Sequence, residues 1–168
     1  MNDEALMLAF QRGSREAFDE LFARYRQPLY GYFRRRLASR ERAEDLTQEA
    51  FLAVLRATER YEPRALVRTY LYGISIKLLA AERRKLARVE CPAGQASDPQ
   101  TDQALWVRQA LDRLEPVERE ILMLREYEQL SYAEIAELLR LPLNTVRTRL
   151  FRSRAALKSQ LEPASNEA

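Results

Sequence analysis

The side chains in this chain that could do chemistry are mainly arginines near the C-terminal end, and that chemistry is recognition of a nucleic acid. Arg147, Thr148, Phe151 and Arg152 recur at helical spacing, so they would share one face of a helix. Arginine pairs with guanine through two hydrogen bonds, whereas threonine and phenylalanine can contact a thymine methyl group. Every charged residue over 140–158 is basic, so this segment predicts a DNA-binding surface.

A helix-turn-helix is predicted to position these side chains. Ser131 and Glu134 have the spacing of a capping box, which marks the start of a helix. Pro142 disfavours helical geometry in the residue before it, so we expect this helix to end after Leu139.

The second helix of this unit is expected to enter a major groove. Asn144 or Thr145 is expected to cap it, while Val146 and Leu150 lie one turn apart and would pack on the first helix. An ordinary helical hairpin with a basic surface is the alternative. The predicted DNA contacts are Asn144, Thr145, Arg147, Thr148, Arg149, Phe151, Arg152 and Arg154.

Enzymatic and metal chemistry are poorly supported by the remaining residues. Histidine, the commonest general base and metal ligand, does not occur. Cys91 is the only cysteine, so no internal disulfide or thiolate cluster can form, which suits a reducing compartment. The acidic N-terminal residues do not resemble a signal peptide, and no apolar run approaches the roughly 20 residues of a membrane span. We therefore expect a cytoplasmic protein that is not an enzyme, holds no cofactor or metal and does not insert into a membrane.

The composition predicts an all-α fold with two small helical domains. Alanine, leucine, glutamate and arginine abound, and these residues favour helices. Residues 88–101 contain Pro92, Gly94 and Pro99 without apolar periodicity, which indicates a flexible linker. The predicted domains are therefore residues 1–87 and 102–161, with a disordered tail over 162–168.

Helical periodicity divides the first domain into five predicted helices. A helix over 3–12 would end at Gly13, and Ser14 would cap the next one. Further helices are expected over 28–37, 43–58 and 66–84. The predicted buried stripe of the fourth helix is Leu46, Ala50, Ala53, Val54 and Ala57. In the second domain, helices over 103–113 and from Pro116 would precede the helix-turn-helix.

Taken together, these segments resemble the bacterial extracytoplasmic-function (ECF) sigma factors. LDRLEPVERE at 111–120, LSYAEIA at 130–136 and TVRTRLFRSR at 145–154 resemble region 4 of that family. AEDLTQEAFL at 43–52, with AF at 17–18, RY at 24–25 and PR at 63–64, resembles region 2. The two blocks keep the order and spacing of the family and cover nearly the whole chain, which makes the resemblance far more specific than a helix-turn-helix alone.

The resemblance implies a sigma factor that binds core RNA polymerase and directs transcription initiation at promoters. The helix matching residues 43–56 would dock on the β′ clamp helices, and region 4 would contact the β flap and read the −35 element. An exposed Leu52 beside carboxylates favours a partner helix over a purely solvated face. The predicted docking residues are Asp45, Gln48, Glu49, Leu52 and Arg56.

The same resemblance implies that residues 61–85 open and read the −10 element. The candidates for DNA contact there are Tyr61, Arg64, Arg68, Tyr70, Tyr72, Lys77, Arg83 and Arg84. The segment departs from the family: Tyr70 replaces a tryptophan, GISIK at 73–77 replaces RIARN, and Ala81 replaces an aspartate. These changes leave the −10 sequence and the efficiency of melting open. The resemblance further implies a monomer when free and an anti-sigma factor as a partner.

Two binding proteins of other classes remain as alternatives. A stand-alone helix-turn-helix regulator would bind its operator by itself, usually as a dimer, and would not need the docking residues on the helix over 43–58. A sigma mimic that sequesters an anti-sigma factor would not need the basic strip of the recognition helix. This chain carries both features, which favours the sigma factor.

Overall fold

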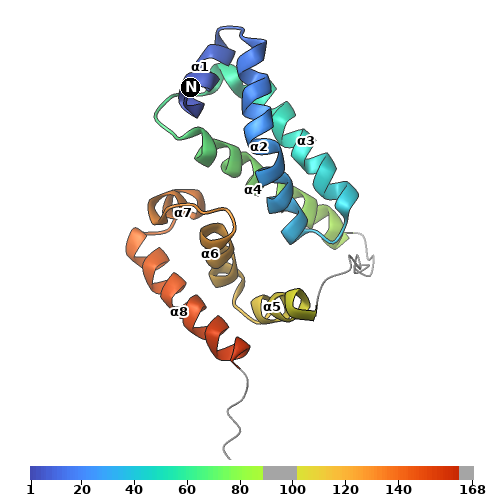
Figure 1. Cartoon of the computed structure of the whole chain (residues 1–168), viewed down its shortest axis with the longest axis vertical. Helices are drawn as coiled ribbons and strands as arrows, with labels where there is room; N and C mark the ends of the chain where they lie inside the picture. The colour runs from blue at the N-terminus through green and yellow to red at the C-terminus, as the bar shows by residue number, and fades with distance from the viewer. Residues whose placement is uncertain (89–101, 163–168) are drawn as a thin grey trace, which may run out of the picture. The chain divides into compact units, whose positions relative to one another are not determined.

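In the computed structural model, all regular structure in the described residues, 1–88 and 102–162, is helical (Figure 1). The all-α prediction is thereby confirmed. The chain divides into two compact units, residues 1–96 (unit 1) and 97–168 (unit 2). The predicted linker and tail lie outside the described residues, except for Arg88 and Glu162 at their edges. No helix within the described ranges is long and apolar enough to cross a membrane.

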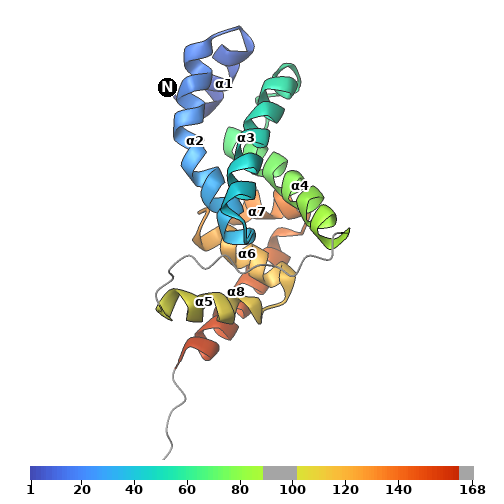
Figure 2. The same ribbon diagram turned by 90° about the vertical axis from the view of Figure 1, so that its right-hand side faces the viewer.

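The described part of unit 1, residues 1–88, contains four α-helices and a short 3-10 turn. They are α1 (Asp3–Gln11), α2 (Arg15–Arg36), α3 (Arg40–Ala57), η1 (Thr58–Arg60) and α4 (Val67–Arg88). Helices α2 and α3 lie side by side in both views, and α4 packs against them (Figures 1 and 2). The core of unit 1 includes the fully buried Met7, Leu29, Phe33, Ala43 and Val67.

Side-chain caps begin the first three helices. The side chains of Asn2, Ser14 and Ser39 each accept a hydrogen bond from a backbone amide in the first turn that follows. Gly13 adopts a positive φ of 99°, a conformation that costs glycine little, directly after the C-cap residue Arg12. The predicted role of Ser14 is confirmed, whereas the C-cap of α1 is Arg12 and Gly13 is the residue that follows it.

Helix α2 is longer than the sequence predicted. Pro28 was expected to begin a separate helix, but the structure has one helix that continues through it. Proline removes one helical hydrogen bond at this position. The buried residues Leu21, Tyr25, Leu29 and Tyr32 keep helical spacing on both sides of Pro28, so a single apolar face offsets that loss.

Helix α3 buries a stripe rotated slightly from the predicted one. Leu46, Ala50 and Val54 are buried as expected, whereas Ala53 and Ala57 are only partly covered. Ala43, Thr47 and Phe51 take the remaining buried positions. The Phe51 ring lies 4.8 Å from that of Phe22 on α2, so Phe51 faces the neighbouring helix α2.

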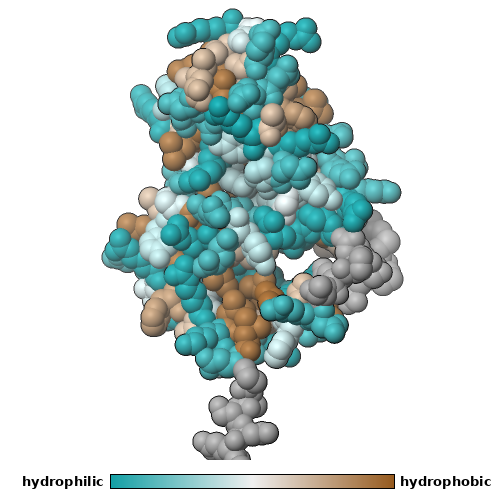
Figure 3. Space-filling view, in the orientation of Figure 1, coloured by the Kyte–Doolittle hydropathy of each residue, from teal (hydrophilic) through white to brown (hydrophobic). Residues whose placement is uncertain are grey.

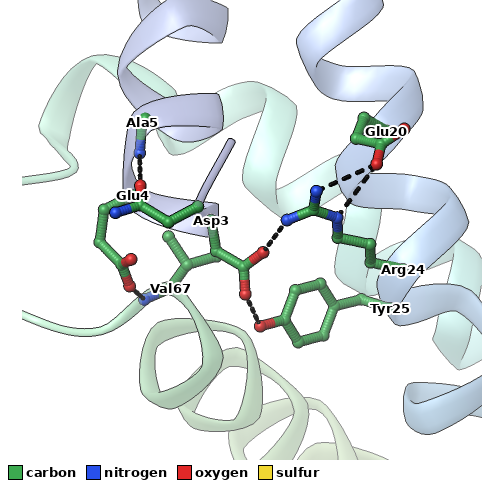
Figure 4. A network of polar contacts seen from close by, with 8 residues as sticks. Asp3, Glu4, Ala5, Glu20, Arg24, Tyr25 and Val67 are labelled. Atoms are coloured by element: carbon green, nitrogen blue, oxygen red, sulfur yellow. Dashed lines mark hydrogen bonds and ion pairs between the residues drawn. The ribbon is translucent and has the colours of Figure 1, made fainter.

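A polar network ties α1 to α2 and to the start of α4 (Figure 4). Asp3 accepts hydrogen bonds from the Arg24 guanidinium, at 2.8 Å, and from the Tyr25 hydroxyl. Burial, followed by the contact with Asp3, raises the pKa of Tyr25. Glu4 accepts a hydrogen bond from the Val67 amide at 3.1 Å. The acidic N-terminal residues are therefore structural.

Unit 2 consists of α5 (Asp102–Asp112), α6 (Pro116–Glu126), α7 (Tyr132–Leu139) and α8 (Leu143–Leu161). The first three helices all contact α8. Pro116 occupies the first turn of α6 as predicted. The central core residues are Ile121, Leu124, Leu130, Ile135, Val146 and Leu150.

Helices α7 and α8 form the predicted helix-turn-helix. The Ser131 side chain accepts a hydrogen bond from the Glu134 amide at 3.1 Å, and the reciprocal contact completes the capping box. Helix α7 ends at Leu139 as expected, but the cause is Arg140, which adopts a left-handed conformation with φ 54°. Its amide donates to carbonyls of the last turn.

The predicted cap of α8 is wrong. The N-cap is Pro142, without a side-chain hydrogen bond, and neither Asn144 nor Thr145 takes that role. Pro142 has extended backbone geometry (φ −60°, ψ 145°), and its carbonyl accepts the first helical hydrogen bond, from Val146 at 3.1 Å. Helix formation can therefore begin at Leu143, which places Asn144 and Thr145 inside the first turn.

Candidate nucleic-acid interface and docking face

The outer face of α8 presents four of the predicted DNA contacts together. Arg147, Thr148, Phe151 and Arg152, hereafter the α8 strip, are all exposed. Phe151 has 76% of its surface exposed although it is a large apolar residue. The residues on the opposite face of the helix, Val146 and Leu150, are buried in the core of unit 2 and hold the strip outward.

The two arginines of the α8 strip have no hydrogen-bond or ion-pair partner among residues 1–88 and 102–162. Their guanidinium groups are therefore available to an external acceptor such as a base edge or a phosphate. The Thr148 hydroxyl donates to the Asn144 carbonyl at 2.9 Å. That bond uses the hydroxyl hydrogen and leaves the methyl group and both oxygen lone pairs for contacts outside the chain.

Two other predicted DNA contacts, Arg149 and Arg154, are instead paired within unit 2. Arg154 donates two hydrogen bonds to Glu126, at 3.0 and 2.6 Å, and these bonds raise the pKa of its guanidinium. The Arg149 guanidinium lies 3.9 Å from the Glu115 carboxylate. The acidic residues at the two ends of α6 thus hold two arginines of α8, while the α8 strip stays unpaired. Asn144 is exposed and Thr145 is partly covered.

The predicted docking residues form one exposed face of α3. Leu52 is 46% exposed and Leu55, which the sequence argument missed, is 44% exposed on the same helix. A groove between α2 and α3 is lined by Arg26, Glu44 and Gln48, among others, so it adjoins this face. All five predicted docking residues are exposed, namely Asp45, Gln48, Glu49, Leu52 and Arg56.

Of the three aromatic residues predicted to stack on unpaired bases, Tyr61 and Tyr72 belong to the core of unit 1, and Tyr70 is partly covered. Tyr61 is 5% exposed, and its hydroxyl donates to the Ala65 carbonyl at 2.8 Å. The Tyr70 ring packs edge-on against it at 5.3 Å between centroids, and burial raises the pKa of both tyrosines. Tyr72 is also buried, 5.7 Å from the ring of Tyr32. In this conformation the rings of Tyr61 and Tyr72 are not available for stacking.

The cations predicted to follow the DNA backbone are more accessible than these rings. Arg68 is only partly exposed, near the start of α4. Arg83 and Arg84 belong to the last turns of α4, where every residue from 83 to 88 is exposed. The exposed candidates are Arg64, Lys77, Arg83 and Arg84.

An ion pair between Arg42 of α3 and the buried Glu82 of α4 was not anticipated. Glu82 is 5% exposed and accepts two hydrogen bonds from Arg42, at 2.8 and 2.6 Å. These bonds lower the pKa of Glu82 below its usual value. The sequence does indicate that Glu82 is buried, because it continues the helical spacing of the buried Ser75 and Leu79. This spacing places its carboxylate on the core face of the helix.

An apolar patch lies on unit 2, away from the α8 strip. Leu105 and Trp106 on α5 are 46% and 50% exposed, and they line a groove together with Leu161 at the end of α8. Figure 3 shows apolar surface where α5 lies near the end of α8. Exposed apolar patches of this kind mark contact sites for other proteins.

Two family descriptions match the chain, one in each unit. Residues 21–89 match "Sigma-70 region 2" and residues 104–157 match "Sigma-70, region 4". The two matches fall on the same segments as the sequence resemblance, and together they span most of the chain.

Curated relatives match this chain over nearly its whole length. The chain is 32% identical to the RNA polymerase sigma-H factor of Pseudomonas aeruginosa, over 99% of this chain and 97% of that one. It is 29% identical to the ECF RNA polymerase sigma-E factor of Haemophilus influenzae, over 97% of each chain.

Solved structures share the fold. CnrH, in complex with the cytosolic domain of CnrY, is 25% identical with a TM-score of 0.73, over 95% of this chain and 96% of that one. The sigma factor RpoE of Bartonella quintana, in complex with the anti-sigma factor NepR, has a TM-score of 0.69 at 21% identity. That match covers 86% of this chain and 96% of RpoE, and at this identity it supports the fold alone.

Proposed function

The chain belongs to the sigma-70 family, as an extracytoplasmic-function sigma factor that directs transcription initiation at promoters, and we propose a role for each of its exposed surfaces. The docking face of α3 binds core RNA polymerase. The α8 strip reads the −35 element, and the basic end of α4 contacts DNA near the −10 element. The protein acts in the cytoplasm and is a monomer when free.

The exposed face of α3 supports the docking role. Asp45 and Glu49 place carboxylates beside the exposed Leu52 and Leu55. An amphipathic partner helix with basic flanks fits such a surface, because its apolar side covers the leucines while its cations meet the carboxylates. We assign the β′ clamp helices of the polymerase as that partner.

The α8 strip supports the −35 role through the availability of its side chains. Arg147 and Arg152 carry charge without an internal partner in the described residues, and Phe151 offers apolar surface for a thymine methyl group. The paired Arg149 and Arg154 are better placed to orient α8 than to read bases. We assign them to phosphate contacts that carry no sequence information.

Unit 2 also offers a surface for a second protein contact. The patch around Leu105 and Trp106 is apolar and distinct from the α8 strip, so a protein could bind it while α8 engages DNA. We propose the β flap of the polymerase as its partner. An anti-sigma factor is a further proposed partner, in line with the complexes that hold CnrH with CnrY and RpoE with NepR.

Co-purification with core RNA polymerase tests the function directly. Wild type is compared with a triple variant, Asp45→Ala, Gln48→Ala and Glu49→Ala, whose side chains are all exposed. We expect stoichiometric binding by wild type and its loss in the triple variant. No binding of wild type to core, together with tight binding to DNA alone, would instead support a stand-alone regulator.

Reversal of one charge should be enough to block docking. Glu49→Lys places a cation where the proposed partner is basic, and like charges at an interface cost several kcal/mol. We expect transcription to be abolished while circular dichroism shows an unchanged helical fold, because Glu49 is exposed. Transcription at the wild-type level would remove the docking role from this face.

A further inference from the structure

The last turns of α4 have no apolar anchor of their own. The buried face of this helix includes Leu71, Ser75, Leu79 and Glu82, and every residue from 83 to 88 is exposed. The basic end of α4, comprising Arg83, Arg84, Lys85 and Arg88, therefore follows directly after a buried carboxylate. Its direction depends on what holds Glu82.

Arg42 of α3 holds Glu82 through two parallel hydrogen bonds. The Arg42 Nε atom lies 2.8 Å from Glu82 Oε1, and Nη2 lies 2.6 Å from Oε2. The Glu82 side chain is only 6% exposed, whereas that of Arg42 is 36% exposed. Such a two-point contact fixes orientation as well as distance, because both groups are planar.

The same guanidinium also contacts the docking face. The Arg42 Nη1 atom lies 3.0 Å from Asp45 Oδ2, and Asp45 is one of the residues assigned to polymerase binding. One arginine thus joins an exposed carboxylate of the docking face to a buried carboxylate of α4. The cluster of Asp45, Arg42 and Glu82 therefore links the docking face to the residue that directly precedes the basic end of α4.

We propose that Glu82, acting through Arg42, is a positioning residue that fixes the basic end of α4 for contact with promoter phosphates. This inference rests on the proposed −10 role of α4 and deepens it. The cations of the basic end make the contact, and the ion pair sets the direction in which they point. Without the pair, the last turns lose their link to α3, and the same cations no longer meet the DNA in a fixed geometry.

A double-mutant cycle on the holoenzyme separates positioning from simple stabilisation. The probe is a fluorescein-labelled duplex promoter, recovered from random DNA by selection with wild-type holoenzyme. Arg84→Ala is measured alone and in a Glu82→Gln background. In the wild-type background we expect a several-fold weaker affinity and a slope of log K against log salt that is smaller by about 1. In the Glu82→Gln background we expect Arg84→Ala to cause almost no further loss.

Asp3→Asn provides the matched control. It breaks another ion pair between helices of unit 1, the 2.8 Å contact of Asp3 with Arg24, and leaves Glu82 intact. In this background Arg84→Ala should keep its full effect, because the basic end of α4 is still held. If both backgrounds suppressed the effect equally, Glu82 would act only through general stability, and the positioning role would be overturned.

The remaining outcomes distinguish this inference from the function on which it rests. If Arg84→Ala and Arg83→Ala have no effect in the wild-type background, the proposed −10 contact itself fails. If Arg84→Ala weakens binding equally with and without Glu82, the contact stands and the positioning role fails. Should Glu82→Gln not fold, Arg42→Lys serves in its place, because lysine keeps the charge but cannot form two parallel bonds.

Discussion

The two segments assigned to DNA, the α8 strip and the end of α4, are built in opposite ways. The α8 strip stands on a core of apolar residues such as Val146 and Leu150, and its arginines have no partner in the described ranges. In unit 1 the aromatic Tyr61 is buried, and the basic end of α4 follows an ion-paired carboxylate.

The α8 strip is therefore a preformed surface, whereas the end of α4 depends on contacts with neighbouring residues. The α8 strip can meet duplex DNA without rearrangement, so little conformational freedom is lost on binding. At α4, the Tyr61 ring could stack on a base only after leaving the core. The exposed cations of α4 are therefore the groups that can engage DNA first.

The largest predicted effect is a loss of stability when the core beneath the α8 strip is changed. Leu150→Ala removes a buried side chain and should lower the free energy of unfolding of unit 2 by about 2–5 kcal/mol. Urea unfolding followed by the fluorescence of Trp106, the only tryptophan, reports on this unit. Phe151→Ala, one residue further on but 76% exposed, should change stability by less than about 0.5 kcal/mol. An equal loss in both variants would mean that the strip is part of the core.

The next prediction compares the loss of promoter affinity on removing unpaired and paired arginines of α8. Arg147→Ala or Arg152→Ala should cost roughly 1–3 kcal/mol in binding to the cognate promoter, as expected for bidentate base contacts. The affinity lost in Arg154→Ala should depend less on the DNA sequence, because Glu126 already holds that guanidinium. Binding is measured by the holoenzyme on the cognate promoter and on a scrambled sequence. An equal loss on both DNAs for Arg147→Ala would make it a phosphate contact.

The comparison also shows which features the sequence could predict. The helix-turn-helix was predictable because a capping box, a proline and an i, i+4 apolar pair are local signals that act within a few residues. The α8 strip followed from them, since the faces of a helix are set once its buried residues are known. The start of α8 was not predicted, because Pro142 takes the N-cap without a side-chain bond.

The features that were missed in unit 1 depend on contacts between distant segments. The continuity of α2 through Pro28 depends on an apolar face completed by other helices. The burial of Tyr61 depends on Tyr70, and that of Glu82 depends on Arg42, 40 positions earlier. The pattern of a single helix does not identify such partners. A tyrosine that suits base stacking and one that suits the core look alike in the sequence.

The smallest effect tests the tyrosine pair of unit 1. The Tyr70 hydroxyl is buried without a hydrogen-bond partner among the described residues, so Tyr70→Phe should stabilise the protein by about 1 kcal/mol. Tyr61→Phe removes the 2.8 Å bond to the Ala65 carbonyl and should destabilise it by about the same amount. Urea unfolding, monitored by circular dichroism, measures the change in stability of each variant. Because neither hydroxyl is presented to solvent, promoter opening should be unchanged in both variants. A slower opening by Tyr70→Phe would show that Tyr70 leaves its place against Tyr61 when DNA melts. The contrast between α4 and α8 would then hold only for the free protein.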